Sequence, residues 1–137
     1  MNQMKSICCY SSLLFITNAI LSYLYKDYIY TFLFTYLTIS SVIHHSNKTL
    51  YTYIFDKIAV FSVVIYGFIQ FRKKINISKN KIIIILIILS FLSTIYLYYY
   101  GYISNTLCFD DNNITAEKWH CLLHLISSIG HNLIIIL

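Results

Sequence analysis

The chain has 137 residues, of which 58 % are hydrophobic and 11 % are charged, with no proline. A soluble domain carries about 25 % charged residues, so the composition excludes an ordinary soluble fold and predicts a membrane protein. The net charge of +5 does not indicate a nucleic-acid partner, because five of the ten basic residues lie in one segment, 72–81, between two apolar stretches.

Five apolar stretches approach the length of about 20 residues that a helix needs to cross the hydrocarbon core. We therefore expect an all-α, polytopic transmembrane bundle that forms a single domain over residues 1–137. No small-residue cleavage site follows the first stretch, so we interpret it as an uncleaved anchor and not as a signal peptide. The expected spans are residues 7–25, 28–44, 53–71, 82–102 and 115–137.

The basic segment 72–81 sets the expected orientation, because cytoplasmic loops carry an excess of lysine and arginine. With five alternating spans, the N-terminus is then lumenal or extracellular and the C-terminus is cytoplasmic. The polar links 46–52 and 105–113 fall on the same side as the N-terminus. We expect an integral membrane protein of an endomembrane whose ligand or substrate is a membrane lipid.

Ionisable side chains inside the expected spans are the strongest functional signal, because a charge near the centre of a span costs about 2.5–3.5 kcal/mol. His120 and His124 are four residues apart and therefore share one helix face. Asp56 begins the third span just after His45 ends the second, and Ser41 lies one turn before His45. The expected topology brings all five side chains to one layer near the lumenal or extracellular surface.

These residue types suit a hydrolytic metal site. Three neutral imidazoles with one open position form a catalytic zinc site, and zinc lowers the pKa of a bound water from 15.7 to about 7. A nearby carboxylate can accept the proton of that water, and a hydroxyl can donate to the developing oxyanion. The pattern predicts Zn²⁺ as the cofactor, with His45, His120 and His124 as metal ligands and Asp56 and Ser41 as catalytic residues.

Other interpretations remain open from the residues alone. The sequence SSVIHH also allows a register in which Ser40 pairs with His44, at a different distance from Asp56. A bis-histidine haem site would explain the paired histidines but not the serine–histidine–aspartate spacing. His131 lies seven residues beyond His124, about 10 Å along a helix, and is interpreted as an interfacial residue.

The pattern S-x3-H-x10-D, followed downstream by H-x3-H, resembles the CREST superfamily of membrane metallohydrolases and is most similar to the alkaline ceramidases. The tail HCLLHLISSIG, with Gly130 six residues after His124, is also similar to the ceramidase ending. The resemblance implies a zinc-dependent lipid amidase that acts on ceramide-like lipids through metal-activated water. Its alternative is a receptor-like or lipid-binding protein that retains the metal site without turnover. The family has seven helices, two more than this chain is expected to have.

The four cysteines lack the spacing of a zinc finger. Cys121 follows His120 directly, about 100° around the helix from the metal face, and is interpreted as a packing residue. The start of the first span and the loop before the last span are expected on the same oxidising side of the membrane. The resemblance to ceramidases implies a disulfide there, from Cys9, or alternatively from Cys8, to Cys108.

Overall fold

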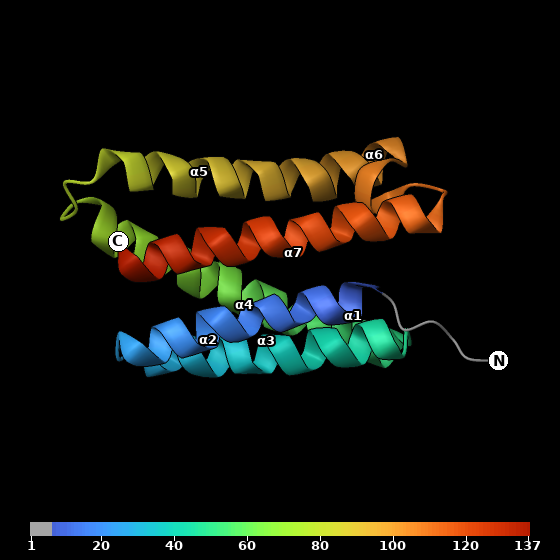
Figure 1. The fold of residues 1–137 in the computed structure, drawn as a ribbon, viewed down its shortest axis with the longest axis horizontal. Coiled ribbons are helices and arrows are strands. Elements are labelled where there is room, and N and C mark those ends of the chain that lie inside the picture. Colours follow the sequence, from blue (N-terminus) through green and yellow to red (C-terminus); the bar gives the residue numbers. More distant parts are fainter. Residues whose placement is uncertain (1–6) are drawn as a thin grey trace.

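The structure, a computed structural model, describes residues 7–137, and within them every regular element is a helix. The predicted all-α class is therefore confirmed. Figure 1 shows long rods that run along one axis, with α5 in one outer layer, α7 in the middle and α2 and α3 in the other outer layer. In chain order the elements are α1 (Ile7–Ser11), η1 (Ser12–Leu14), α2 (Phe15–Leu24), α3 (Tyr28–Ser46), α4 (Leu50–Ile75), α5 (Lys81–Ile95), η2 (Tyr96–Tyr100), α6 (Gly101–Ser104), η3 (Leu107–Phe109) and α7 (Asn113–Ile136).

In the described part of the chain, four helical segments are long and apolar enough to cross a membrane. The expected second span, residues 28–44, corresponds to α3 and is not among them, so the count of five spans is not confirmed. This helix has 19 residues, YIYTFLFTYLTISSVIHHS, and its threonines, serines and histidines lower its mean hydropathy. The four segments are Ile7–Leu24, Leu50–Ile75, Lys81–Ser104 and Asn113–Ile136.

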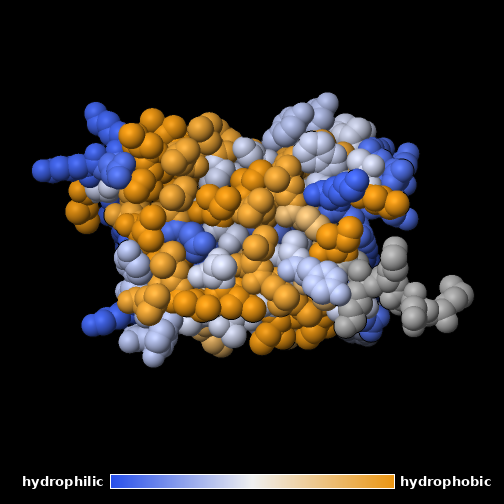
Figure 2. Space-filling view, viewed as in Figure 1, coloured by the Kyte–Doolittle hydropathy of each residue, from blue (hydrophilic) through white to orange (hydrophobic). Residues whose placement is uncertain are grey.

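The surface of the bundle is apolar around its middle. Large side chains such as Phe32, Phe68 and Ile85 are 69 %, 62 % and 55 % exposed. Figure 2 shows hydrophobic residues over most of the middle of one face, with hydrophilic residues gathered at the two ends. Soluble monomers rarely expose so much apolar surface, and this distribution is compatible with an integral membrane protein.

Polar residues in the short links start the long helices. Asp27, Asn80 and Asn112 accept hydrogen bonds from backbone N–H groups in the first turns of α3, α5 and α7. Thr49 forms a capping box with Thr52 at the start of α4. These contacts satisfy N–H groups that have no partner within the helix, so each link ends one helix and begins the next within a few residues.

The predicted basic segment lies at the end of the bundle that holds the C-terminus (Figure 1). Arg72 and Lys73 are exposed. Lys74 instead turns inward, and its Nζ donates to the carbonyl oxygens of Ile134 and Ile135 at 2.8 and 2.7 Å. A cation is favourable beside the carbonyl end of a helix, so Lys74 fastens the end of α7 to α4.

The structure corrects the interfacial interpretation of His131, which is 1 % exposed in the core of the bundle. The hydroxyl of Tyr30 on α3 is hydrogen-bonded to His131 Nδ1. The rings of Phe34 and Phe91 pack edge-on against the imidazole, with centroids 5.2 and 5.0 Å away. A Cβ atom at Gly67 on α4 would lie 2.7 Å from both His131 Cε1 and the Tyr30 hydroxyl, so this contact requires glycine.

We predict that Gly67→Ala lowers the free energy of unfolding by about 1–3 kcal/mol, because the added methyl group overpacks the Tyr30–His131 contact. Chemical unfolding in detergent micelles measures the change. Val64→Ala, at an exposed position on the same helix, is the matched control and should change stability much less. Equal stability of the two variants would show that the close approach at Gly67 is not needed.

Candidate metal centre

The three predicted metal ligands converge at one end of the bundle. One ring nitrogen from each of His45, His120 and His124 lies within 4.8 Å of the others. The ring centroids are 4.8 Å apart for His120–His124, 5.1 Å for His45–His120 and 5.4 Å for His45–His124. One helical turn of α7 therefore presents two imidazoles to a third at the end of α3, as the four-residue spacing predicted.

The tautomer of His124 follows from its neighbour on α1. Ser11 Oγ lies 2.8 Å from His124 Nδ1 and 3.1 Å from the Cys8 carbonyl oxygen. A serine hydroxyl has one proton, and the Cys8 carbonyl can only accept it, so His124 donates Nδ1–H to Ser11. The lone pair on His124 Nε2 then remains for a metal ion. Ser11 could not be recognised from the sequence, because serines are frequent in this chain and its position carries no motif.

One ring nitrogen of His45 also lacks a hydrogen-bond partner. His45 is 8 % exposed, and its Nδ1 is buried without a hydrogen-bond partner. Buried polar atoms are nearly always paired, and one left alone costs free energy unless something else binds it. Three convergent imidazoles with no acidic ligand among them match the nitrogen donors that zinc accepts.

The position of His44 argues against its use as a ligand in place of His45. Its Nδ1 lies 3.3 Å from Thr52 Oγ1, and its ring packs on Tyr53 at a centroid distance of 5.8 Å. His44 is thus turned toward the start of α4, and the cluster takes His45. The imidazoles of the cluster pack edge-on against one another, with ring centroids 4.8–5.4 Å apart.

Asp56 is buried on α4, at 5 % exposure. Its Oδ1 has no hydrogen-bond partner, and its Oδ2 lies 3.8 Å from Lys57 Nζ. Lys57 in turn sits over the rings of Tyr53 and Tyr98, 5.3 and 5.2 Å from their centroids. The carboxylate therefore has one oxygen facing a cation and one oxygen able to accept a proton.

Sequence analysis also missed Lys57. Its charge acts on all three histidines of the cluster. The signal was a basic residue directly after the aspartate inside an apolar helix, where an ionisable side chain is costly.

The predicted serine, Ser41, contacts another serine and not the histidine cluster. Ser41 is buried, and its Oγ lies 2.8 Å from Ser12 Oγ. The Ser12 hydroxyl donates to the Cys8 carbonyl oxygen at 2.7 Å, so Ser41 is the donor in the pair of serines. Ser41, the predicted oxyanion donor, therefore donates its proton to Ser12 of η1 in this structure.

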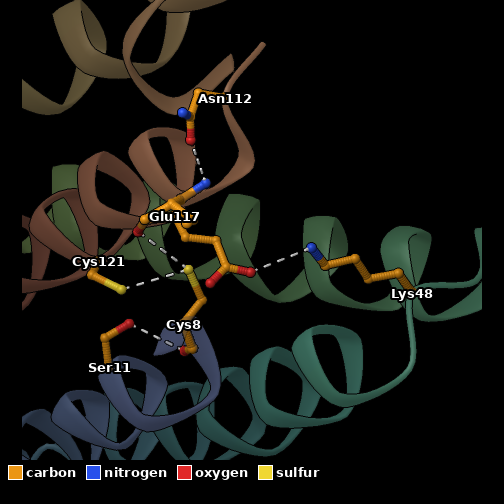
Figure 3. Close-up of polar contacts among 7 residues, drawn as sticks. Cys8, Ser11, Lys48, Asn112, Glu117 and Cys121 are labelled. Carbon is orange, nitrogen blue, oxygen red and sulfur yellow. Dashed lines mark hydrogen bonds and ion pairs between the residues drawn. The ribbon is translucent and has the colours of Figure 1, made fainter. Parts of the chain in front are cut away.

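A cavity of about 490 Å³ gives access to the cluster, and His45 and His120 form part of its wall. Lys48 and Glu117 also line it, and Lys48 Nζ lies 4.0 Å from Glu117 Oε1 (Figure 3). The approach to the histidines is therefore polar and charged, although the bundle around it is apolar.

The cysteines do not pair as the resemblance implied. Cys9 and Cys108 are free thiols, and Cys9 Sγ lies 3.3 Å from Ser46 Oγ on α3. Consecutive residues on a helix point about 100° apart, so Cys9 faces α3 while Cys8 faces α7. Because Cys108 is a free thiol, the implied bridge to it from Cys9, or alternatively from Cys8, is not formed. Cys8 Sγ instead lies 3.6 Å from Cys121 Sγ.

Comparison with known proteins adds no relative: no family model, curated protein or solved structure matches the chain.

We predict that Ser11→Ala weakens zinc binding by about 10–100-fold, because the hydrogen bond that orients His124 is lost. Competition with a zinc chelator measures the affinity. Ser46→Ala, which removes an exposed hydroxyl that bonds to Cys9, is the control and should bind zinc like the unchanged chain. If both variants held zinc equally well, Ser11 would have no part in orienting the ligand.

Proposed function

We propose that this chain is a zinc-dependent hydrolase of membrane lipids, an amidase that acts on ceramide-like substrates. The observation that carries the proposal is the convergence of three imidazoles inside an apolar helical bundle, with one buried ring nitrogen left unpaired. Histidines inside a membrane bundle are expensive, so three of them at one point indicate a functional site.

His45, His120 and His124 would hold the zinc ion. When bound, zinc supplies Lewis acidity and lowers the pKa of a water molecule to about 7. The residues of the chain then keep the ligands in place, with Ser11 fixing the tautomer of His124.

Asp56 is the proposed general base. Its Oδ1 is buried without a hydrogen-bond partner and would accept a proton from water, and Asp56 itself is not among the described residues that line the cavity. The ammonium of Lys57 lies 3.8 Å from the other carboxylate oxygen.

An apolar groove on another face of α7 supports a lipid substrate. The groove has a volume of about 400 Å³ and lies between α5 and α7, and its walls include Leu92, Leu97, Leu122 and Ile126. Leu122 lies between His120 and His124 in the sequence, so the groove and the histidine cluster occupy different faces of the same turn of α7. The groove and the polar cavity share no lining residue.

The proposal includes the orientation expected from the sequence. The basic segment 72–81 lies at the end of the bundle opposite to the metal cluster (Figure 1). The positive-inside rule assigns this segment to the cytoplasm, and the metal cluster then faces the lumen or the cell exterior. In this proposal α3 also spans the membrane, in addition to the four apolar segments, and it is enclosed on two sides by α2 and α4.

One observation favours a second candidate function, a lipid-binding or receptor-like protein that keeps the metal site without turnover. The Ser41 hydroxyl donates to Ser12, and Ser41 is not among the described residues that line the cavity. An oxyanion at the metal site would lack this donor unless the two serines separate.

We predict that Asp56→Asn keeps about one zinc ion per chain and lowers turnover by about 10²–10⁴-fold, because an amide cannot accept the proton. Zinc content and hydrolysis of a panel of ceramides are measured on the same preparation. Asp111→Asn, an exposed change in the loop before α7, should leave both unchanged.

Three outcomes decide between the candidates. Full turnover in Asp56→Asn would remove this residue from the mechanism. A zinc-loaded native chain that hydrolyses no ceramide would favour the lipid-binding function. A native chain that binds no zinc would contradict both.

A further inference from the structure

Two thiols from opposite ends of the chain meet beside the metal cluster. Cys8 on α1 and Cys121 on α7 are 113 residues apart in sequence, and their sulfur atoms are 3.6 Å apart (Figure 3). Cys8 is 2 % exposed, and its thiol also donates to the Glu117 carbonyl oxygen at 3.5 Å. Neither thiol has a role in the proposed hydrolysis.

We propose that Cys8 and Cys121 are a redox site that forms a disulfide and locks α1 onto α7. A disulfide has its sulfur atoms about 2.05 Å apart, so the two must close by about 1.5 Å. Rotation of the side chains and a small shift of α1 can supply this movement. The pair differs from the bridge between Cys9 and Cys108, and it follows from the observed positions of the sulfur atoms.

An oxidant can reach the pair through the cavity. Cys8 forms part of the wall of the 490 Å³ cavity that also reaches His45 and His120. The polar entrance between Lys48 and Glu117 suits a charged, water-soluble disulfide such as oxidised glutathione.

The other two cysteines, Cys9 and Cys108, are less suitable partners for a disulfide. Cys9 points at Ser46 on α3, away from α7. Cys108 also lines the cavity, and burial raises the pKa of its thiol to about 11. The contact of 3.6 Å between the sulfur atoms of Cys8 and Cys121 is the observation that selects this pair.

The chemistry is thiol–disulfide exchange with a small-molecule disulfide. One cysteine thiolate attacks a sulfur of oxidised glutathione, which forms a mixed disulfide and releases one glutathione thiolate that takes up a proton. The second cysteine then attacks the sulfur of the first, forms the Cys8–Cys121 bond and releases the second glutathione. Two thiols of the chain are oxidised, and one glutathione disulfide is reduced to two thiols.

The bond would act on the metal cluster through Ser11. Ser11 lies one helical turn after Cys8 and accepts the hydrogen bond of His124 Nδ1. Cys121 lies between His120 and His124 on α7. A covalent bond at this point restrains the two helices that orient His124, so zinc should leave the oxidised chain more slowly. This consequence rests on the proposed zinc site, whereas the disulfide itself does not.

The test uses the full chain, purified in detergent micelles, fully reduced and then incubated with oxidised glutathione at neutral pH. The protein is denatured in N-ethylmaleimide, and its disulfides are mapped by mass spectrometry of unreduced peptides. We expect a Cys8–Cys121 peptide as the main product, with maleimide on Cys9 and Cys108. Cys9→Ser and Cys108→Ser are matched controls that keep this product, and Cys121→Ser abolishes it.

A main product that joins Cys108 to Cys8 or Cys9, or unreacted thiols at Cys8 and Cys121, would overturn the proposal. The second readout is the rate of zinc release to a chelator, which we expect to be about tenfold slower in the oxidised chain. Equal rates in the two forms would show that the bond does not restrain the cluster. A chain that binds no zinc would overturn the proposed function alone, because the peptide map is read without metal.

Discussion

Hydrogen bonds between the first and last helices hold the bundle together around its metal end. Asn18 on α2 donates to the Ser128 carbonyl oxygen and to Asn132 Oδ1, both at 2.8 Å, and Ser128 Oγ donates back to Asn18 Oδ1 at 2.8 Å. In lipid, apolar contact gives helices little reason to associate, and buried polar contacts of about 0.6–2 kcal/mol each help to fix their pairing. Residues more than 100 positions apart are brought together in this way.

The row of polar contacts between the first rod (α1, η1 and α2) and α7 continues to the histidine cluster. Asn18, Ser11 and Cys8 follow one side of the first rod and meet Ser128, His124 and Cys121 in the same order along α7. The contacts that align the two helices therefore also set the position of a metal ligand. Stability and site geometry depend on one interface.

The convergence of His45, His120 and His124 could be predicted because the residue types and the spacing agreed. Histidines four residues apart share a helix face, and antiparallel helices return His45 to the same level. The contacts of Ser11 and Ser41 could not be predicted, because a serine proton goes to whichever acceptor the packing brings near. His131 was misplaced because nothing in the sequence of α7 shows that Gly67, on another helix, leaves room for its ring. The neighbour of the N-terminal cysteines could not be predicted, because only the packing of α1 against α7 brings Cys8 beside Cys121.

The polar composition of α3 has a consequence for biogenesis. A helix rich in hydroxyl groups gains less free energy than its neighbours on leaving the insertion channel for lipid, and its two histidines reduce that gain further. Its polar side chains are covered by α2 and α4 in the folded bundle, so a place for α3 in the bilayer would depend on these neighbours. It also supplies His45, while the other two histidines belong to α7, which is synthesised later. The histidine cluster therefore forms only after α7 has joined a helix that is already held by its neighbours.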